Sequence, residues 1–173
     1  MDTAAPSSLR LFLGLWPTTL ERIALERHAH AWQWPASARH TPPERLHLTL
    51  HFLGEVASGR LPDLKEGLEV EWGACELLLD VAQVWPGGIA VLEAGTVPPE
   101  LLQLHAVLGE RLTALGMVTE ARRYRPHATL ARKAFGARPP AGFEPLRWRT
   151  GPHYHLVRSL PGGRGYETLQ VFG

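Results

Sequence analysis

Two short segments of the sequence combine an imidazole with a hydroxyl at the same spacing. Thr49 follows His47 by two positions, and Thr129 follows His127 in the same way. With an unperturbed pKa of about 6.5, a histidine near neutral pH either accepts a proton or donates one. Two histidines on opposite sides of a phosphorus atom supply the base and the acid of an in-line displacement. Threonine hydroxyls donate to the non-bridging oxygens, where negative charge grows. This chemistry needs no metal and no cofactor.

Both segments are predicted to be β-strands, in which side chains alternate between two faces. In the first strand the apolar positions share the face that is predicted to pack into the core: Leu46, Leu48, Leu50 and Phe52. His47, Thr49 and His51 then share the other face. The second strand repeats the arrangement, with His127 and Thr129 on one face. A single His-x-Thr is common, but two copies on strands with an apolar opposite face favour a catalytic pair.

The rest of the pattern alternates strands with helices in two similar halves. Further strands are predicted over residues 9–16, 76–85, 89–93, 154–160 and 166–172. Helices are predicted over residues 17–32, 61–72 and 98–116. Each half has a strand, a helix and then a His-x-Thr strand. We therefore expect an α+β fold in which two antiparallel-rich lobes pack side by side within one domain, residues 1–173.

The composition excludes several other classes of protein. A length of 173 residues suits one domain, and 45% apolar with 20% charged residues is typical of a soluble globular protein. The single cysteine, Cys75, excludes an intramolecular disulfide framework and a multi-cysteine zinc site. No basic region precedes a long apolar run at the N-terminus, and no stretch approaches the roughly 20 apolar residues of a membrane helix. A cytoplasmic protein that does not enter a membrane is expected.

Two histidine pairs and one basic cluster have more than one interpretation. His28 with His30, and His153 with His155, lack a carboxylate or cysteine at a metal-binding spacing, so solvated or structural histidines are expected rather than a metal site. The net charge of +1 is too balanced to identify a nucleic-acid-binding protein. Six basic residues nonetheless lie within 17 positions around the second His-x-Thr, either as a solvated face or as an RNA contact: Arg122, Arg123, Arg125, Arg132, Lys133 and Arg138.

The motifs resemble those of a known family. RLFLGLWP at residues 10–17, LHLTLHFLGEV at 46–56 and RPHATLAR at 125–132 are similar to segments of the 2H phosphoesterases. Within that superfamily they resemble the bacterial and archaeal RNA 2′,3′-cyclic phosphodiesterases, historically called 2′-5′ RNA ligases. The resemblance covers nearly the whole chain. It departs from the family pattern at Arg158, where an acidic residue is frequent, and at Ala128, where a larger apolar residue is usual.

The resemblance implies two pseudo-symmetric lobes, each an antiparallel-rich sheet with outer helices, around a central cleft. The cleft would hold one His-x-Thr from each lobe. The reaction it implies is the opening of a 2′,3′-cyclic phosphate at an RNA 3′ end to leave a 2′-phosphate, with His127 as base and His47 as acid. RNA with a cyclic phosphate end would be the partner, and the protein is expected to be a monomer.

Four further residues are candidate substrate contacts. Arg132 would bind phosphate, although strict alternation points it away from His127 unless a bulge or the strand end re-aims it. Tyr124 and Arg125 would stack on a base or bind a backbone phosphate, or Tyr124 would instead pack on the sheet. His51 is expected at the rim of the cleft.

Other functions fit the same residues. The scaffold could act on a cyclic nucleotide or join 2′-5′ RNA ends, and product analysis on each type of substrate separates these activities. A non-catalytic module that binds RNA ends would not need two proton-transfer groups, and a turnover assay on a simple cyclic nucleotide tests it.

Overall fold

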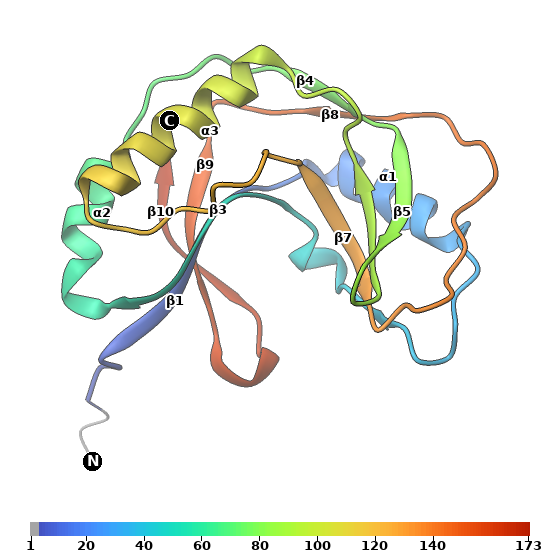
Figure 1. The fold of residues 1–173 in the computed structure, drawn as a ribbon, viewed down its shortest axis with the longest axis horizontal. Coiled ribbons are helices and arrows are strands. Elements are labelled where there is room, and N and C mark those ends of the chain that lie inside the picture. Colours follow the sequence, from blue (N-terminus) through green and yellow to red (C-terminus); the bar gives the residue numbers. More distant parts are fainter. Residues whose placement is uncertain (1–3) are drawn as a thin grey trace.

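The computed structural model describes residues 4–173 as two lobes that meet at a central seam (Figure 1). The first lobe contains four neighbouring strands: β10 (Tyr166–Phe172), β9 (Tyr154–Ser159), β1 (Ser8–Leu15) and β3 (Leu48–Ala57). The second lobe continues the same sheet with three strands: β7 (His127–Arg132), β6 (Ile89–Glu93) and β5 (Val81–Trp85). A short strand, β2 (Arg39–His40), pairs with β7. All of these pairings are antiparallel, which confirms the predicted α+β fold with two lobes.

The lobes are joined through the sheet at one residue pair. Leu48 on β3 lies opposite Ala128 on β7, and no further ladder between these two strands forms in the described chain. Both residues are fully buried. The two strands that carry the His-x-Thr motifs therefore meet at the residue between each histidine and its threonine.

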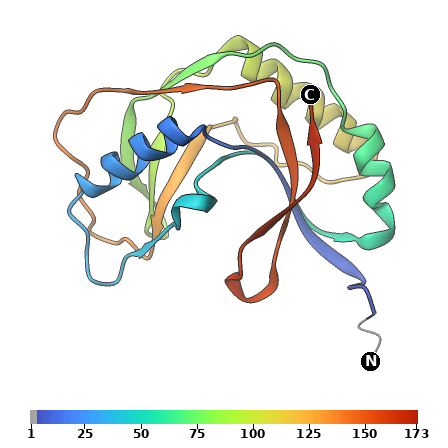
Figure 2. The ribbon, with the colours of Figure 1, turned by 180° about the vertical axis from the view of Figure 1, so that it is seen from behind.

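Each lobe has its main helix on the outside. In both views α1 (Thr19–His30) lies on the side of β5, β6 and β7, and α3 (Pro99–Ala114) lies on the side of β1, β3 and β9 (Figures 1 and 2). A short helix, α2 (Leu61–Gly67), follows β3. A separate two-stranded sheet pairs β4 (Glu76–Leu79) with β8 (Leu146–Arg149). Three short 3-10 turns complete the fold: Pro43–Arg45, Ser58–Arg60 and Pro161–Gly163.

The ends of the two long helices follow from local sequence. The Thr18 hydroxyl accepts from the Glu21 backbone N–H at 3.3 Å, and the Glu21 carboxylate accepts from the Thr18 N–H at 2.8 Å, so α1 begins with a capping box. The other Glu21 oxygen accepts from the Arg149 N–H at 2.7 Å and ties α1 to β8. Pro99 occupies the first turn of α3, and Gly116 follows its end with a φ of 79°.

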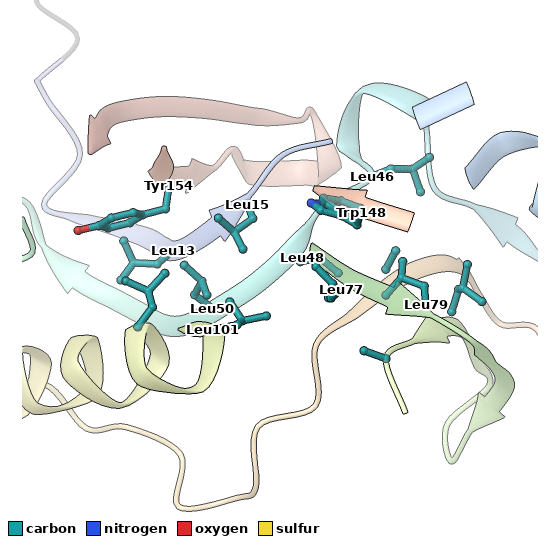
Figure 3. Close-up of a cluster of buried hydrophobic side chains, with 14 of the residues drawn as sticks. Leu13, Leu15, Leu46, Leu48, Leu50, Leu77, Leu79, Leu101, Trp148 and Tyr154 are labelled. Carbon is teal, nitrogen blue, oxygen red and sulfur yellow. The ribbon is translucent and has the colours of Figure 1, made fainter. Parts of the chain in front are cut away.

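The core is built mainly from leucines. Figure 3 shows leucines of β1 and β3 against α3 and the β4–β8 sheet, with Trp148 and Tyr154 among them. The buried face of α3 carries the leucines that its helical spacing predicts: Leu101, Leu104, Leu108 and Leu112. Each fully buried leucine contributes about 1.5–3 kcal/mol relative to an exposed one, so this core holds the strands that carry the histidines in place.

A β-bulge interrupts the first His-x-Thr strand. Gly14 of β1 pairs with Thr49, and the next residue of β1, Leu13, pairs with His51. Leu50 is therefore an extra residue on β3, and the alternation shifts by one position after it. His51 turns to the core side together with Leu13, and Phe52 turns to the cleft side, where 45% of it is exposed.

The second His-x-Thr strand has a bulge at the matching position. Val91 of β6 pairs with Thr129, and Ala90 pairs with Ala131, so Leu130 is the extra residue. Ala90 and Ala131 both belong to the buried core. The residue after Ala131 is Arg132, which consequently returns to the face of Thr129.

Several element boundaries differ from the predictions. Residues 76–85 form two strands rather than one, because the chain turns at Asp80, whose carboxylate accepts from the Gly95 N–H at 2.7 Å. Strand β8 lies in a segment for which no strand was predicted, because its proline- and glycine-rich flanks hide a four-residue strand. Helix α2 ends at Gly67 rather than at residue 72. No helix within residues 4–173 is long and apolar enough to cross a bilayer.

Candidate active site

His47 is held by a hydrogen bond to its own chain. It lies just before β3, and its Nδ1 is 2.6 Å from the carbonyl oxygen of Arg45. A carbonyl oxygen only accepts, so Nδ1 carries the proton and Nε2 is the free base in the neutral ring. Nε2 in turn accepts from the Thr49 hydroxyl at 3.1 Å. The imidazole is thereby fixed in tautomer and direction before any substrate arrives.

His127 repeats this arrangement in the other lobe. It is the first residue of β7, and its Nδ1 is 2.7 Å from the carbonyl oxygen of Arg125, two residues earlier. Nε2 is again the atom free to accept a proton. The same backbone device thus orients both imidazoles.

The register at the seam brings the two motifs together. Because residues 48 and 128 lie opposite each other in an antiparallel pair, position 47 falls beside 129 and position 49 beside 127. Each histidine therefore neighbours the threonine of the other strand, and the two imidazoles occupy opposite corners. A phosphate between them would have one imidazole on each side and a hydroxyl near each imidazole.

The two histidines differ in their electrostatic surroundings. Burial lowers the pKa of His47 to about 4, the hydrogen bond to Arg45 opposes this, and the charges of His127 and Arg132 lower the pKa further. Burial also lowers the pKa of His127, where the Glu93 carboxylate acts in the opposite direction. No carboxylate contributes to the pKa of His47. Since each positive ring opposes protonation of the other, a single shared proton is held more readily by His127.

Aromatic rings surround His47 in the first lobe. The Trp16 ring stacks on the imidazole with centroids 4.9 Å apart and planes at 12°, and the Phe12 ring lies 4.9 Å away. Tyr166 meets His47 edge-on at 5.4 Å and is 38% exposed. The guanidinium of Arg45 lies 5.9 Å from the Tyr166 ring centroid. This wall explains the desolvation of His47 and leaves Tyr166 as its accessible ring.

Charged groups surround His127 in the second lobe. Trp85 lies 4.2 Å from the imidazole centroid, and the Arg125 guanidinium lies 4.5 Å above the Trp85 ring. Arg125 also donates twice to the buried Glu93 carboxylate, at 2.8 and 3.1 Å. Glu93 further accepts from Gln83 and, at 3.3 Å, from Trp85. Glu93 lies opposite His127 on the neighbouring strand. A carboxylate whose charge is paired with the Arg125 guanidinium therefore lies beside this imidazole.

Arg132 lies on the sheet face of His127 and Thr129 because of the bulge at Leu130. Unbroken alternation would have pointed it away from His127 and Thr129. The bulge restores it to their face, and its charge lowers the pKa of both histidines. The structure therefore brings Arg132 close to the two His-x-Thr motifs.

The prediction that His51 shares the face of His47 and Thr49 is wrong. The bulge at Leu50 turns His51 under α3, where only 8% of it is exposed and its Nε2 donates to the His105 carbonyl at 2.8 Å. Its ring stacks on that of His105 with centroids 4.0 Å apart. His51 thus packs between strand and helix and does not line the rim of the cleft.

Tyr124 is packed rather than presented to a base. Its ring stacks on the other face of His105 at 4.0 Å, and its hydroxyl donates to the Thr49 carbonyl at 3.0 Å. The hydrogen bond links the chain just before β7 to β3, across the seam. Of the two interpretations of Tyr124 from the sequence, the structure supports packing on the sheet. Arg125 stays at the edge of the site, half-exposed and paired with Glu93.

The residues that line the two histidines were not among the predicted site residues. They come from four different strands or strand ends, and only two of them fall in a family-like segment: Phe12, Trp16, Tyr166, Trp85 and Glu93. One signal was available, since Trp16 ends an apolar strand that also belongs to the family-like segment. The pairing of Glu93 with His127 needs the sheet register, which no local pattern gives.

The remaining predicted positions have structural roles. His28 accepts from the Trp32 indole at 3.0 Å, and His153 lies 3.4 Å from the Phe172 carbonyl. Arg158 pairs with Glu167 on β10 at 3.5 Å, and the small Ala128 is buried at the seam. Within residues 4–173 no three His, Cys, Asp or Glu side chains are grouped as a metal site.

Comparisons with known proteins agree with this architecture. Residues 19–87 match the family model of LigT-like phosphoesterases. E. coli LigT in complex with 3′-AMP superposes with a TM-score of 0.81 at 25% identity, over 95% of this chain and 97% of that chain. A protein described as a phosphoesterase gives a TM-score of 0.83 at 27% identity, over 95% and 97%. A protein from Thermus thermophilus gives 0.75 at 26% identity, with the same coverage. The search of curated proteins found no match.

Proposed function

We propose that this chain, which is similar to the LigT-like phosphoesterases over residues 19–87 and in its fold, hydrolyses the 2′,3′-cyclic phosphate at RNA 3′ ends to a 2′-phosphate. The observation that carries the proposal is the matched pair of imidazoles. Each has its Nδ1 bonded to the carbonyl two residues earlier, and each stands across the seam from the other. Two imidazoles whose Nε2 atoms carry no proton in the neutral ring suit a reaction that removes one proton and adds another.

The reaction balances with these groups alone. One neutral imidazole takes a proton from water while the water oxygen bonds to phosphorus. The bond from phosphorus to the 3′ oxygen breaks in line, and the other ring, as imidazolium, gives its proton to that oxygen. The products are a 2′-phosphate and a 3′-hydroxyl, and the pair keeps one proton. Thr129 donates to a non-bridging oxygen as its charge increases, Thr49 does the same once its hydroxyl turns from His47 Nε2 to the phosphate, and Arg132 balances that charge.

The surroundings of this pair favour a particular division of roles. The family resemblance implies that His127 is the base. In this chain the aromatic wall and the absence of a carboxylate favour a neutral His47. Burial, Arg125 and Arg132 also lower the pKa of His127, but there the hydrogen bond to the Arg125 carbonyl and the Glu93 carboxylate oppose them. We therefore assign the base to His47 and the acid to His127 for the hydrolytic direction.

The neighbours support a nucleotide ligand. E. coli LigT has been crystallised with 3′-AMP and with NADP⁺, and both compounds carry a phosphate on an adenosine ribose. The exposed Tyr166 beside Trp16 offers this chain a ring on which a base can stack.

The direct test uses an oligoribonucleotide that ends in a 2′,3′-cyclic phosphate. We expect conversion to an end that carries a 2′-phosphate, at a rate that chelators do not change. A product with a 3′-phosphate would reverse the choice of leaving oxygen. A chain-joined product with a 2′-5′ linkage would instead favour ligation on the same scaffold.

A further inference from the structure

Two arginines lie beyond the histidines along the edge of β7. Arg39 on β2 lies directly opposite Arg132 at the end of β7, and both are exposed. Strand β6 occupies one edge of β7, so β2 and β3 share the other edge, which borders the seam. Arg39 therefore lies along the same edge that brings His47 and His127 together, past the point where β3 leaves β7.

Arg39 also faces the same way as the reactive groups. Residues directly opposite each other on neighbouring strands project from the same face of a sheet. The bulge at Leu130 places Arg132 on the face of Thr129, so its partner Arg39 projects from that face too. Without the bulge, both arginines would lie on the other side of the sheet.

Like charges placed in this way normally weaken a strand pair. Among the ion pairs within residues 4–173, neither Arg39 nor Arg132 has a carboxylate partner. The chain nevertheless holds β2 firmly against β7. The Ser37 hydroxyl donates to the Lys133 carbonyl at 2.9 Å. Thr41 donates twice, through its hydroxyl to the Thr129 carbonyl at 2.8 Å and through its N–H to the Leu130 carbonyl at 2.9 Å. The two arginines are thus kept opposite each other on neighbouring strands, and neither forms an ion pair with a carboxylate in the described residues.

From this arrangement we propose that Arg39 and Arg132 together bind the phosphodiester on the 5′ side of the terminal nucleotide. This inference rests on the proposed function and adds a preference for oligoribonucleotides over mononucleoside 2′,3′-cyclic phosphates. A nucleotide with a cyclic 2′,3′-phosphate has one neighbouring phosphate, which is attached through its 5′ oxygen. Guanidinium groups bind phosphate through paired hydrogen bonds, and Arg132 is placed to reach both the cyclic phosphate and this neighbour.

The orientation of the sugar agrees with this placement. In ribose the 3′ carbon leads through the 4′ and 5′ carbons to the 5′ phosphate, whereas the base is attached next to the 2′ carbon. With His127 protonating the 3′ oxygen, the 5′ phosphate leaves the cleft on the second lobe, where Arg39 lies. The base then falls toward Trp16 and Tyr166 on the first lobe.

A different role for Arg39 must be distinguished. Exposed positively charged residues on a short edge strand also prevent edge-to-edge association. That role predicts more aggregation when the charge is removed and no change in ligand preference. The test therefore compares ligands that differ only in the second phosphate.

Binding is measured with adenosine 3′-monophosphate and adenosine 3′,5′-bisphosphate. For the wild type we expect about fivefold tighter binding of the bisphosphate, as charge-assisted contacts at a partly exposed site allow. In Arg39→Gln this ratio should fall to near one. Arg27→Gln, which removes an exposed arginine from α1, should keep the wild-type ratio. An unchanged ratio in Arg39→Gln would overturn the proposal.

Turnover separates this inference from the proposed function. The two substrates are a dinucleotide with a 2′,3′-cyclic phosphate end and a mononucleoside 2′,3′-cyclic phosphate. We expect kcat/KM of the wild type to be about fivefold higher for the dinucleotide. In Arg39→Gln the two values of kcat/KM should be nearly equal. Equal ratios in both proteins would overturn the second phosphate site alone. If the wild type turns over neither substrate, the proposed function fails, and the binding ratio still decides the role of Arg39.

Discussion

The two lobes present the same reactive pair in opposite settings. In the first lobe His47 is enclosed by Phe12, Trp16 and Tyr166. In the second, His127 stands beside Trp85 and the Glu93–Arg125 ion pair. The backbone anchor of each imidazole is the same, so the difference lies entirely in what surrounds it. A repeated motif can thus give chemically unequal histidines, and the inequality is what acid–base catalysis requires.

The contrast extends from the histidines to the rest of each lobe. Arg132 in the second motif corresponds to Phe52 in the first, and Ala131 corresponds to His51, because both bulges lie one residue after the threonine. Around His47 the first lobe places mainly rings, whereas the second lobe adds the charges of Arg125 and Arg132 beside His127. We infer that the first lobe is suited to bases and the second to phosphates.

The largest predicted effect concerns the histidines themselves. His47→Ala and His127→Ala should each lower turnover of a cyclic-phosphate substrate by about a hundredfold or more, because each loses a proton-transfer group. In a substrate whose 3′ oxygen is replaced by sulfur, the leaving group is a thiolate, which departs without being protonated. With this substrate the His127 variant should recover activity and the His47 variant should not.

Steady-state kinetics on both substrates, with circular dichroism as a folding control, checks this pair. Recovery by the His47 variant instead would reverse the assigned roles. Near-normal turnover in either variant with the oxygen substrate would show that its histidine transfers no proton.

The threonines should have the next largest effect, and an unequal one. Removing one donor to a developing oxyanion costs up to about 3 kcal/mol in a closed site, so Thr49→Val and Thr129→Val should lower kcat by about tenfold to a hundredfold, more than they change KM. Thr49 also donates to Nε2 of His47, the assigned base. Only Thr49→Val should therefore shift the limb of the pH–rate profile that reports the protonation of His47. Thr→Ser at each position serves as the control and should keep much of the activity.

Tyr166 should affect binding rather than chemistry. Loss of a stacked ring typically weakens the binding of one base by about 1–3 kcal/mol, and Tyr166 is partly packed on Phe12 and Trp16. We expect Tyr166→Ala to raise KM for a nucleoside cyclic phosphate about fivefold with a smaller change in kcat. Tyr166→Phe keeps the ring and should behave like the wild type. A KM unchanged by the alanine substitution would contradict a base site on the first lobe.

The smallest predicted effect concerns the histidine stack under α3, which has no counterpart in the second lobe. Burial and the neighbouring His51 lower the pKa of His105 to about 4, and burial lowers that of His51 as well. The unfolded imidazole titrates near 6.5, so between these values the unfolded chain binds more protons. Stability should therefore fall as pH drops from about 6.5 to about 4. Because the ring is only partly buried, we expect His105 to account for about 1 kcal/mol of this loss.

Thermal or urea unfolding at pH 7 and pH 4.5 measures this dependence. His105→Phe keeps a ring between His51 and Tyr124 but cannot bind a proton, so its stability should change less over this interval. His30→Gln, an exposed replacement on α1, should leave the pH dependence as in the wild type. An equal loss in His105→Phe would assign the acid sensitivity to other groups.

Local patterns predicted most strands and the two central histidines, but not the course of a strand after its bulge. Period-two alternation holds from Leu46 to Thr49 and then fails, so it misplaced His51 and Phe52. The cause is one extra residue whose presence depends on pairing with β1. For the same reason the sequence left the direction of Arg132 open, since this side chain points toward His127 only if a bulge or the strand end breaks the alternation. Glu93 and Trp85 became neighbours of His127 through the register of β5, β6 and β7, which the sequence alone does not reveal.

The helices carry a further consequence for how the chain folds. Helix α1 follows β1 of the first lobe but lies on the side of the second, and α3 follows β6 of the second lobe but packs against β3 of the first. Neither lobe is therefore built from one continuous stretch of the polypeptide. Most of the stabilising contacts must wait for distant segments to meet, which slows folding and makes it cooperative. We expect one unfolding transition for the whole chain, and fragments divided near the middle should fold only when both are present.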